Sequence, residues 1–191
     1  KTKQDIEISG FLMATIAWGK RSMIINNGHK LMELMNNEPY EFVKNAGPKD
    51  IKRLEGFVHR TFQFIDIEYF VKALQQIYHN HNSLEPAFNG KSQKERLVNF
   101  HHYFLSFQAP KRTTKHVANP EKGSSAKRLN MFLRWMVRKD QCGVDFGIWD
   151  SIPMSDLHCP LDVHTGNIAR KLGLLERKAN DWKAVEELQK H

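Results

Sequence analysis

Cysteine is scarce in this sequence of 191 residues: there are two, Cys142 and Cys159, and neither belongs to a Cys-x-x-Cys pair. Their scarcity disfavours the four-ligand zinc and iron–sulfur sites, and two isolated thiols are typical of a reducing compartment. Long apolar runs are also lacking. The longest candidate, residues 8–17, is much shorter than the roughly 20 apolar residues that cross a bilayer. We therefore expect no metal, no cofactor and no membrane.

The alternation of apolar and polar residues that is typical of half-buried strands is almost missing. Apolar residues recur instead at helical spacing, most clearly over residues 64–78, where Phe64, Ile67, Val71 and Leu74 fall on one side. Asp5 is the expected N-cap of the first helix. The expected helices cover residues 5–18, 20–35, 64–78, 92–107, 127–138, 163–172 and 182–190, the last one capped by Asp181. This pattern predicts an all-α protein, a single helical unit over residues 1–191 with room for two helical subdomains.

The formal net charge is +8, which favours a polyanionic partner, and nucleic acid is the commonest one. The basic side chains gather before and along the helix expected at residue 127. For Arg134 and Arg138, which lie four residues apart, a solvated helix face is an equally good explanation. The basic residues of this region are Lys122, Lys127, Arg128, Arg134, Arg138 and Lys139.

Two residues near expected helix starts carry possible chemistry. Lys127 falls in the first turn of one helix, where the positive end of the helix dipole disfavours an ammonium group. A neutral amine can attack an electrophilic sugar carbon and form a Schiff base. Asp162, directly before another helix, could accept the amine proton and stabilise a cationic sugar. Both residues also fit simpler roles, a solvated lysine and an N-cap.

A short segment around Asp162 resembles a known family. Pro160-Leu161-Asp162-Val163-His164 resembles the segment that carries the catalytic aspartate of helix-hairpin-helix DNA glycosylases. In that superfamily the aspartate opens a helix with Ile or Val, Ala and Arg, as Ile168-Ala169-Arg170 do here. The nucleophilic lysine is followed three places later by Asn or another small polar residue, as Lys127 is followed by Asn130. The resemblance implies a glycosylase-like helical bundle, with Lys127 as nucleophile and Asp162 as its acidic partner.

The resemblance is specific over about residues 120–174, the hairpin and catalytic segment, and two features depart from it. Gly123-Ser124-Ser125-Ala126 stands where the hairpin has Gly-hydrophobic-Gly. The spacing from Lys127 to Asp162 exceeds that of endonuclease III-like members and is closer to archaeal 8-oxoguanine glycosylases. The nearest match is an uncharacterised bacterial family with the signature found at residues 127–138. The four-cysteine iron–sulfur loop of endonuclease III is absent.

The resemblance implies base-excision DNA repair. A damaged base, with 8-oxoguanine as a candidate, would be removed through a Lys127 Schiff base, followed by strand scission at the abasic site. The implied partner is double-stranded DNA with a damaged base, bound by a cytoplasmic, nucleoid-associated monomer. Trp18, at the end of the first helix, lies where related glycosylases place a DNA-inserting residue, so it is a candidate base wedge or pocket residue, or else a core aromatic. Phosphate contacts are expected from Lys122, Gly123, Ser124, Ser125, Arg128, Arg134 and His164.

Two other functions remain open at this point. A non-catalytic helical DNA-binding protein on the same scaffold would fit the altered hairpin. A metal-dependent phosphodiesterase is disfavoured, because no carboxylate or cysteine completes a ligand set around His79 and His81 or around His101 and His102.

Overall fold

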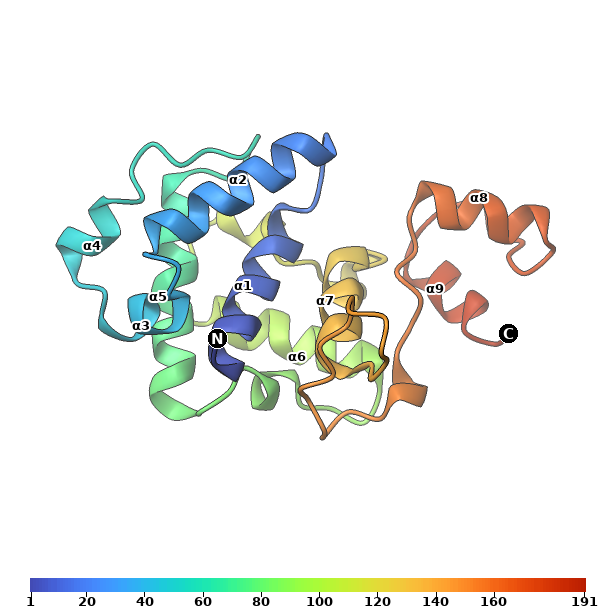
Figure 1. Ribbon diagram of the computed structural model, residues 1–191. Coiled ribbons are helices and arrows are strands. Elements are labelled where there is room, and N and C mark those ends of the chain that lie inside the picture. The colour runs from blue at the N-terminus through green and yellow to red at the C-terminus, as the bar shows by residue number, and fades with distance from the viewer. The chain divides into compact units, whose positions relative to one another are not determined.

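A computed structural model describes all residues, 1–191, as helices joined by loops, with no β-strand (Figure 1). The predicted all-α class is confirmed. The chain divides into two compact units, the alternative to a single unit that the sequence had left room for. Unit 1 contains Lys1–Ala87 and His102–Val117, and unit 2 contains Phe88–His101 and Ala118–His191. No helix combines the length and the apolar character that a membrane span requires.

Unit 1 is packed around three phenylalanine rings from different helices. Phe11 of α1 stacks on Phe70 of α5 with 5.5 Å between ring centroids, and Phe104 of α6 meets both rings edge-on, at 5.2 and 4.9 Å. All three side chains are buried, and such aromatic pairs add stability beyond their buried area. The helices of this unit are α1 (Lys3–Ile16), α2 (Arg21–Leu34), α3 (Pro39–Asn45), α4 (Pro48–Lys52), α5 (Phe64–Asn80) and the end of α6 (Gln93–Leu105).

The start of α1 differs from the prediction. Asp5 was expected as the N-cap, but the helix begins earlier and Thr2 occupies that position. Thr2 Oγ1 accepts a hydrogen bond from the Asp5 backbone N–H at 3.1 Å, and Asp5 Oδ2 accepts one from the Thr2 N–H at 3.0 Å. This reciprocal capping box satisfies two N–H groups that the first turn would leave unpaired, so the predicted start two residues later was wrong.

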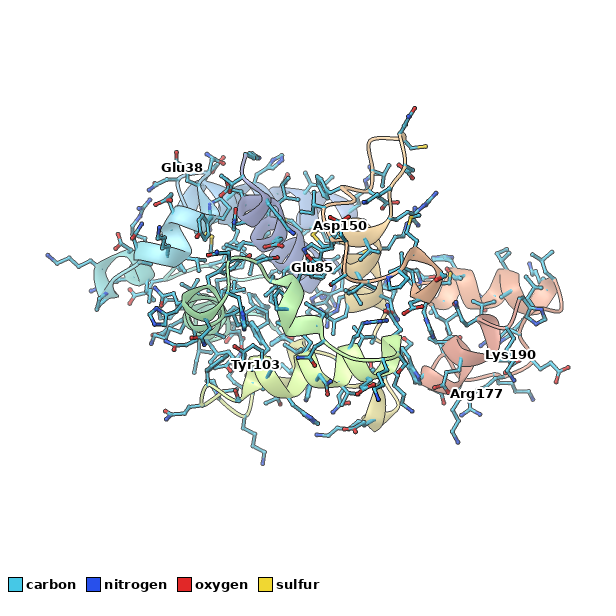
Figure 2. The ribbon with its side chains drawn as sticks, turned by 90° about the horizontal axis from the view of Figure 1, so that it is seen from below. Glu38, Glu85, Tyr103, Asp150, Arg177 and Lys190 are labelled. Carbon is cyan, nitrogen blue, oxygen red and sulfur yellow. The ribbon has the colours of Figure 1, made fainter.

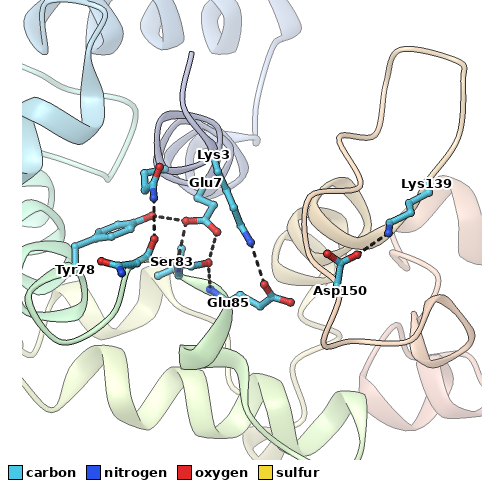
Figure 3. Close-up of polar contacts among 10 residues, drawn as sticks. Lys3, Glu7, Tyr78, Ser83, Glu85, Lys139 and Asp150 are labelled. Carbon is cyan, nitrogen blue, oxygen red and sulfur yellow. Dashed lines mark hydrogen bonds and ion pairs between the residues drawn. The ribbon is translucent and has the colours of Figure 1, made fainter.

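A buried carboxylate ties α1 to the end of α5 (Figure 3). Glu7 is fully buried, and its oxygens accept hydrogen bonds from Tyr78 Oη at 2.8 Å, from Ser83 Oγ and from the Leu84 backbone N–H at 3.0 Å. A buried charge is tolerated only when donors surround it in this way. The polar cluster therefore fixes where the chain turns after α5.

Replacing Glu7 with alanine should lower the free energy of unfolding by about 2–4 kcal/mol, because one buried and two half-buried donors would lose their acceptor. Urea denaturation followed by circular dichroism measures the change. Glu33→Ala on the exposed side of α2 is the control and should stay within about 0.5 kcal/mol. Equal stabilities of the two variants would contradict this account of the cluster.

Unit 2 has its own aromatic core. Phe88 stacks on Phe100 with 3.9 Å between centroids, and Trp149 meets Phe132 of α7 at a right angle, 5.4 Å away. Trp149 reaches this core because its backbone N–H donates to the carbonyl of Met136, near the end of α7. The helices of unit 2 are the first part of α6, α7 (Lys127–Val137), α8 (Val163–Lys171) and α9 (Trp182–Leu188), with short 3-10 turns at Pro120–Lys122 and Met154–Asp156.

The ends of the loops in unit 2 are fixed by ion pairs. Lys139 pairs with Asp150 across the stretch that follows α7 (Figure 3). Asp181 is the N-cap of α9, as predicted, and accepts from the Ala184 N–H at 3.1 Å. Arg177, labelled in Figure 2, donates two hydrogen bonds to the Asp181 carboxylate and is the main reason that the pKa of this group falls to about 2. The carboxylate therefore stays charged throughout the neutral range.

Candidate functional site

Lys127 and Asp162 lie next to each other in unit 2. Lys127 is the first residue of α7, Asp162 is the N-cap of α8, and 3.8 Å separates Lys127 Nζ from Asp162 Oδ2. Each side chain is a little over one-third exposed, so a ligand can reach both. The structure thus brings together the two residues that the sequence singled out, both at helix N-termini.

The two oxygens of Asp162 have different tasks. Oδ1 accepts a hydrogen bond from the Thr165 backbone N–H at 2.9 Å, which caps α8, while Oδ2 faces Lys127. The Thr165 hydrogen bond lowers the pKa of Asp162 below its usual range; burial opposes this, and the positive charge of Lys127 reinforces it. Asp162 is therefore a fixed negative charge at neutral pH. This suits the stabilisation of a cation better than the storage of a proton.

The turn before α7 is built on left-handed backbone. Gly123 has φ 81° and Ala126 has φ 47°, which is costly for a residue with a Cβ. Ser124 Oγ accepts from the Ala126 N–H at 3.2 Å, and the Gly123 carbonyl accepts from Trp182 N–H at 3.1 Å. The turn is therefore held from within and by the start of α9, and α7 begins without a side-chain cap.

A fully buried asparagine stabilises this turn. Asn130 Nδ2 donates to the Ser125 carbonyl at 3.1 Å, and its Oδ1 accepts from Gln93 Nε2 at 3.1 Å. Ser125 Oγ in turn donates to the Leu161 carbonyl at 3.4 Å, directly before Asp162. These bonds connect the chain before α7 to the chain before α8, and they explain why Lys127 and Asp162 meet.

Asn180 stabilises the other side of the site, a role that no motif in the sequence indicates. Its Nδ2 donates to the Asp162 carbonyl at 3.2 Å, and its Oδ1 accepts from Arg170 Nη2 at 2.6 Å. Arg170 also donates to the carbonyls of Arg177 and Lys178, so it serves the scaffold. Gly166 makes room for this contact, since a Cβ there would come within 2.6 Å of Asn180 Oδ1.

Some residues of the predicted phosphate contact are accessible, and others are already hydrogen-bonded within the protein. Lys122 and Gly123 are exposed, and nothing lies within 4 Å of a Cβ built on Gly123. The hydroxyls of Ser124 and Ser125 are used inside the turn, as described above. The backbone N–H of Lys127 donates to no acceptor in the protein. This N–H and Lys122, rather than serine hydroxyls, therefore offer the anion contact here.

The three other predicted contacts differ in accessibility. Arg128 is half-buried, and burial lowers its pKa. Arg134 Nε lies 3.2 Å from Asp145 Oδ2, which also lies 3.3 Å from Arg138 Nη1, so one buried carboxylate engages both arginines. This ion pair is a structural role for Arg134 that competes with a phosphate contact. His164, on the first turn of α8, is exposed.

Trp18 belongs to unit 1 and follows the end of α1. It is half-buried, and the guanidinium carbon of Arg60 lies 4.6 Å from its ring centroid. One face of the ring is therefore covered by an arginine of the same unit. A cation over an indole face is a favourable contact.

The fold and this site define an all-α protein with a lysine–aspartate pair at two helix N-termini. The chain belongs to the family described as protein of unknown function DUF2400, which matches residues 1–191. No curated protein and no solved structure matches the chain.

Replacing Asn180 with alanine should loosen the start of α8, because the Asp162 carbonyl and the Arg170 guanidinium would both lose a partner. We expect a loss of about 1–3 kcal/mol in unfolding free energy and faster amide exchange over residues 162–171. Hydrogen exchange with mass spectrometry measures this. Asn167→Ala, on the exposed side of α8, is the matched control and should leave exchange unchanged; the same protection in both variants would remove Asn180 from the scaffold.

Proposed function

We propose that this protein is a DNA glycosylase with lyase activity at abasic sites, with Lys127 as the nucleophile. The observation that carries the proposal is the 3.8 Å approach of Lys127 Nζ to Asp162 Oδ2. An accessible amine beside a fixed carboxylate is the arrangement that imine chemistry on a sugar requires. The resemblance of residues 160–164 to the helix-hairpin-helix glycosylases supports the same conclusion, and 8-oxoguanine is the first base to test.

The reaction begins when the Lys127 ammonium of the ion pair gives one proton to water. The neutral Lys127 amine attacks C1′ of the damaged nucleotide, and the electron pair of the glycosidic bond leaves with the base. One amine proton goes to the departing base and the other to O4′ as the sugar ring opens, which leaves an imine between Nζ and C1′. Water protonates the imine and takes the proton from C2′; the electron pair of the C2′–H bond forms a C2′=C3′ double bond as the C3′–O bond breaks, so the 3′-phosphate leaves and the strand is cut.

Asp162 acts in this scheme through its charge. Positive charge develops on the sugar as the base departs, and a carboxylate oxygen beside C1′ stabilises it. Because the Thr165 N–H keeps the carboxylate ionised, Asp162 needs no change of protonation before the reaction. In the free protein its ion pair with Lys127 is partly exposed, and such pairs are worth at most about 1 kcal/mol, so DNA can displace it.

DNA would reach this pair by its phosphates. The uncapped start of α7 offers the N–H group of Lys127, and Lys122 adds a positive charge on the same hairpin. A helix N-terminus with flanking lysine is a general anion site and carries no base preference. The recognition of the lesion would then come from elsewhere, with Trp18 as a candidate for the extruded or opposite base.

The second candidate function is DNA binding without turnover. The observation that favours it is the altered hairpin, in which Ala126 with φ 47° replaces the flexible glycine of the superfamily pattern. Such a protein would bind the same DNA and form no covalent intermediate.

Lys127→Gln should abolish the adduct that borohydride traps between the protein and DNA containing 8-oxoguanine or an abasic site, because no amine remains to attack C1′. Asp162→Asn should slow strand cleavage by about two to three orders of magnitude, since the amide carries no negative charge. Asparagine also caps helices well, so the stability of α8 is retained. Denaturing gels measure both effects.

Lys178→Gln is the matched control, because it removes one exposed lysine of the same unit outside the proposed DNA contacts and should leave trapping intact. An undiminished adduct with Lys127→Gln would show that another amine is the nucleophile. No adduct with the wild-type protein on any lesion, together with tight binding, would favour the non-catalytic function.

DNA affinity should fall steeply as salt rises, largely independently of sequence, because lysine contacts to phosphates release counterions. Lys122→Glu should weaken binding and reduce the slope of log K against log [salt] by about 1. Lys178→Glu, an exposed lysine before α9, is the control. Fluorescence anisotropy on labelled duplexes gives the slopes, and salt-independent binding would contradict phosphate recognition.

A further inference from the structure

Arg60 stands at the tip of a tight turn in unit 1. The turn is closed by a bridge in which His59 N–H donates to the Phe62 carbonyl at 2.8 Å and Phe62 N–H donates to the His59 carbonyl at 3.0 Å. The side chains of His59 and Phe62 are fully buried, whereas Arg60 is exposed. Arg112 fixes the turn further by donating to the Thr61 carbonyl at 3.1 Å. The turn is therefore rigidly anchored below its tip.

The backbone of Arg60 has φ 57°, in the left-handed region. Glycine or asparagine would occupy this position with less strain. A long, charged side chain at a strained, exposed position points to a use for that side chain.

The guanidinium of Arg60 lies on the indole of Trp18, 4.6 Å from the ring centroid. The Trp18 backbone is fixed in turn: its carbonyl accepts from His59 Nε2 at 3.0 Å, and Asn27 Nδ2 donates to His59 Nδ1 at 2.9 Å. Gly19 allows the close approach, since a Cβ there would lie 3.2 Å from Arg60 Nη1. Trp18 is thus a platform that orients Arg60.

The hydrogen-bonding capacity of this cluster is unused. Arg60 makes no ion pair or hydrogen bond, so the edges of its guanidinium remain open to a ligand with paired acceptors. The Trp18 Nε1–H is shielded from solvent and has no acceptor within the protein. Lys20 and Arg21 follow Gly19 in the chain, are exposed and are also unpaired. The cluster is therefore positively charged, with no carboxylate of the chain paired to its cationic side chains.

We propose that Arg60, stacked on Trp18, binds a phosphate of the DNA backbone as a contact of unit 1, with Lys20 and Arg21 as flanking charges. This inference rests on the proposed function, because DNA is the polyanion. It changes the role of Trp18: the side chain that meets DNA is Arg60, and Trp18 orients it. A phosphate matches the planar fork of an arginine and carries no sequence information.

The test compares Arg60→Gln with Arg53→Gln, an exposed arginine of the same unit that donates to Asn36. Binding is measured by fluorescence anisotropy on undamaged duplexes of different sequence and on a duplex with an abasic-site analogue. Arg60→Gln should weaken binding about three- to tenfold at low salt and reduce the salt slope by about 1, equally on all duplexes. Arg53→Gln should behave as wild type.

Arg60→Gly separates binding from folding. Glycine relieves the left-handed strain, so Tm should be unchanged or higher while DNA binding falls as in Arg60→Gln. Equal binding by Arg60→Gln and wild type would overturn the inference and leave the proposed function standing. If the loss of DNA binding in Arg60→Gln depended on the base sequence, Arg60 would contact bases rather than phosphates, and this result would also overturn the inference. A wild-type protein that binds no duplex at low salt would overturn both proposals, whereas trapping by Lys127 tests the proposed function alone.

Discussion

The left-handed turn at Ala126 is the constraint on which the candidate site depends. It starts α7 at Lys127 without a side-chain cap, and Lys127 lies 3.8 Å from Asp162. The turn persists because the buried Asn130 binds the Ser125 carbonyl, and Ser125 binds the chain just before Asp162. A strained backbone held by buried hydrogen bonds is typical of sites where positions of side chains matter more than local stability.

The pattern of apolar residues was sufficient to predict the all-α fold class and the helix α5. The N-cap role of Asp181 was predicted from its residue type and position alone. The start of α1 was missed because Thr2 lies outside the apolar pattern that marked the helix. The meeting of Lys127 with Asp162 was expected from a family resemblance, not from periodicity. The hydrogen bonds that produce it join residues far apart in the chain, and one sequence carries no signal for such pairs.

The sequence did not predict which charged side chains form ion pairs within the protein. Arg134 lies in a basic stretch of the sequence and was therefore expected to contact DNA. In the structure, Asp145 forms ion pairs with both Arg134 and Arg138. The sequence did not predict a role for Arg60, because residue types reveal neither its positive φ nor its contact with Trp18. Which arginine is free for a ligand is decided by tertiary ion pairs, and only the structure separates Arg60 from Arg134.

The central claim is that the amine of Lys127, among the many lysines of this chain, forms a covalent bond to the sugar. Mass-spectrometric peptide mapping of the borohydride-reduced wild-type adduct tests it most directly. The account predicts the sugar remnant on the peptide that contains Lys127, at Lys127 Nζ, and no modification at Lys122 or Lys139. A remnant on either of those lysines, or on the N-terminal amine, would contradict it.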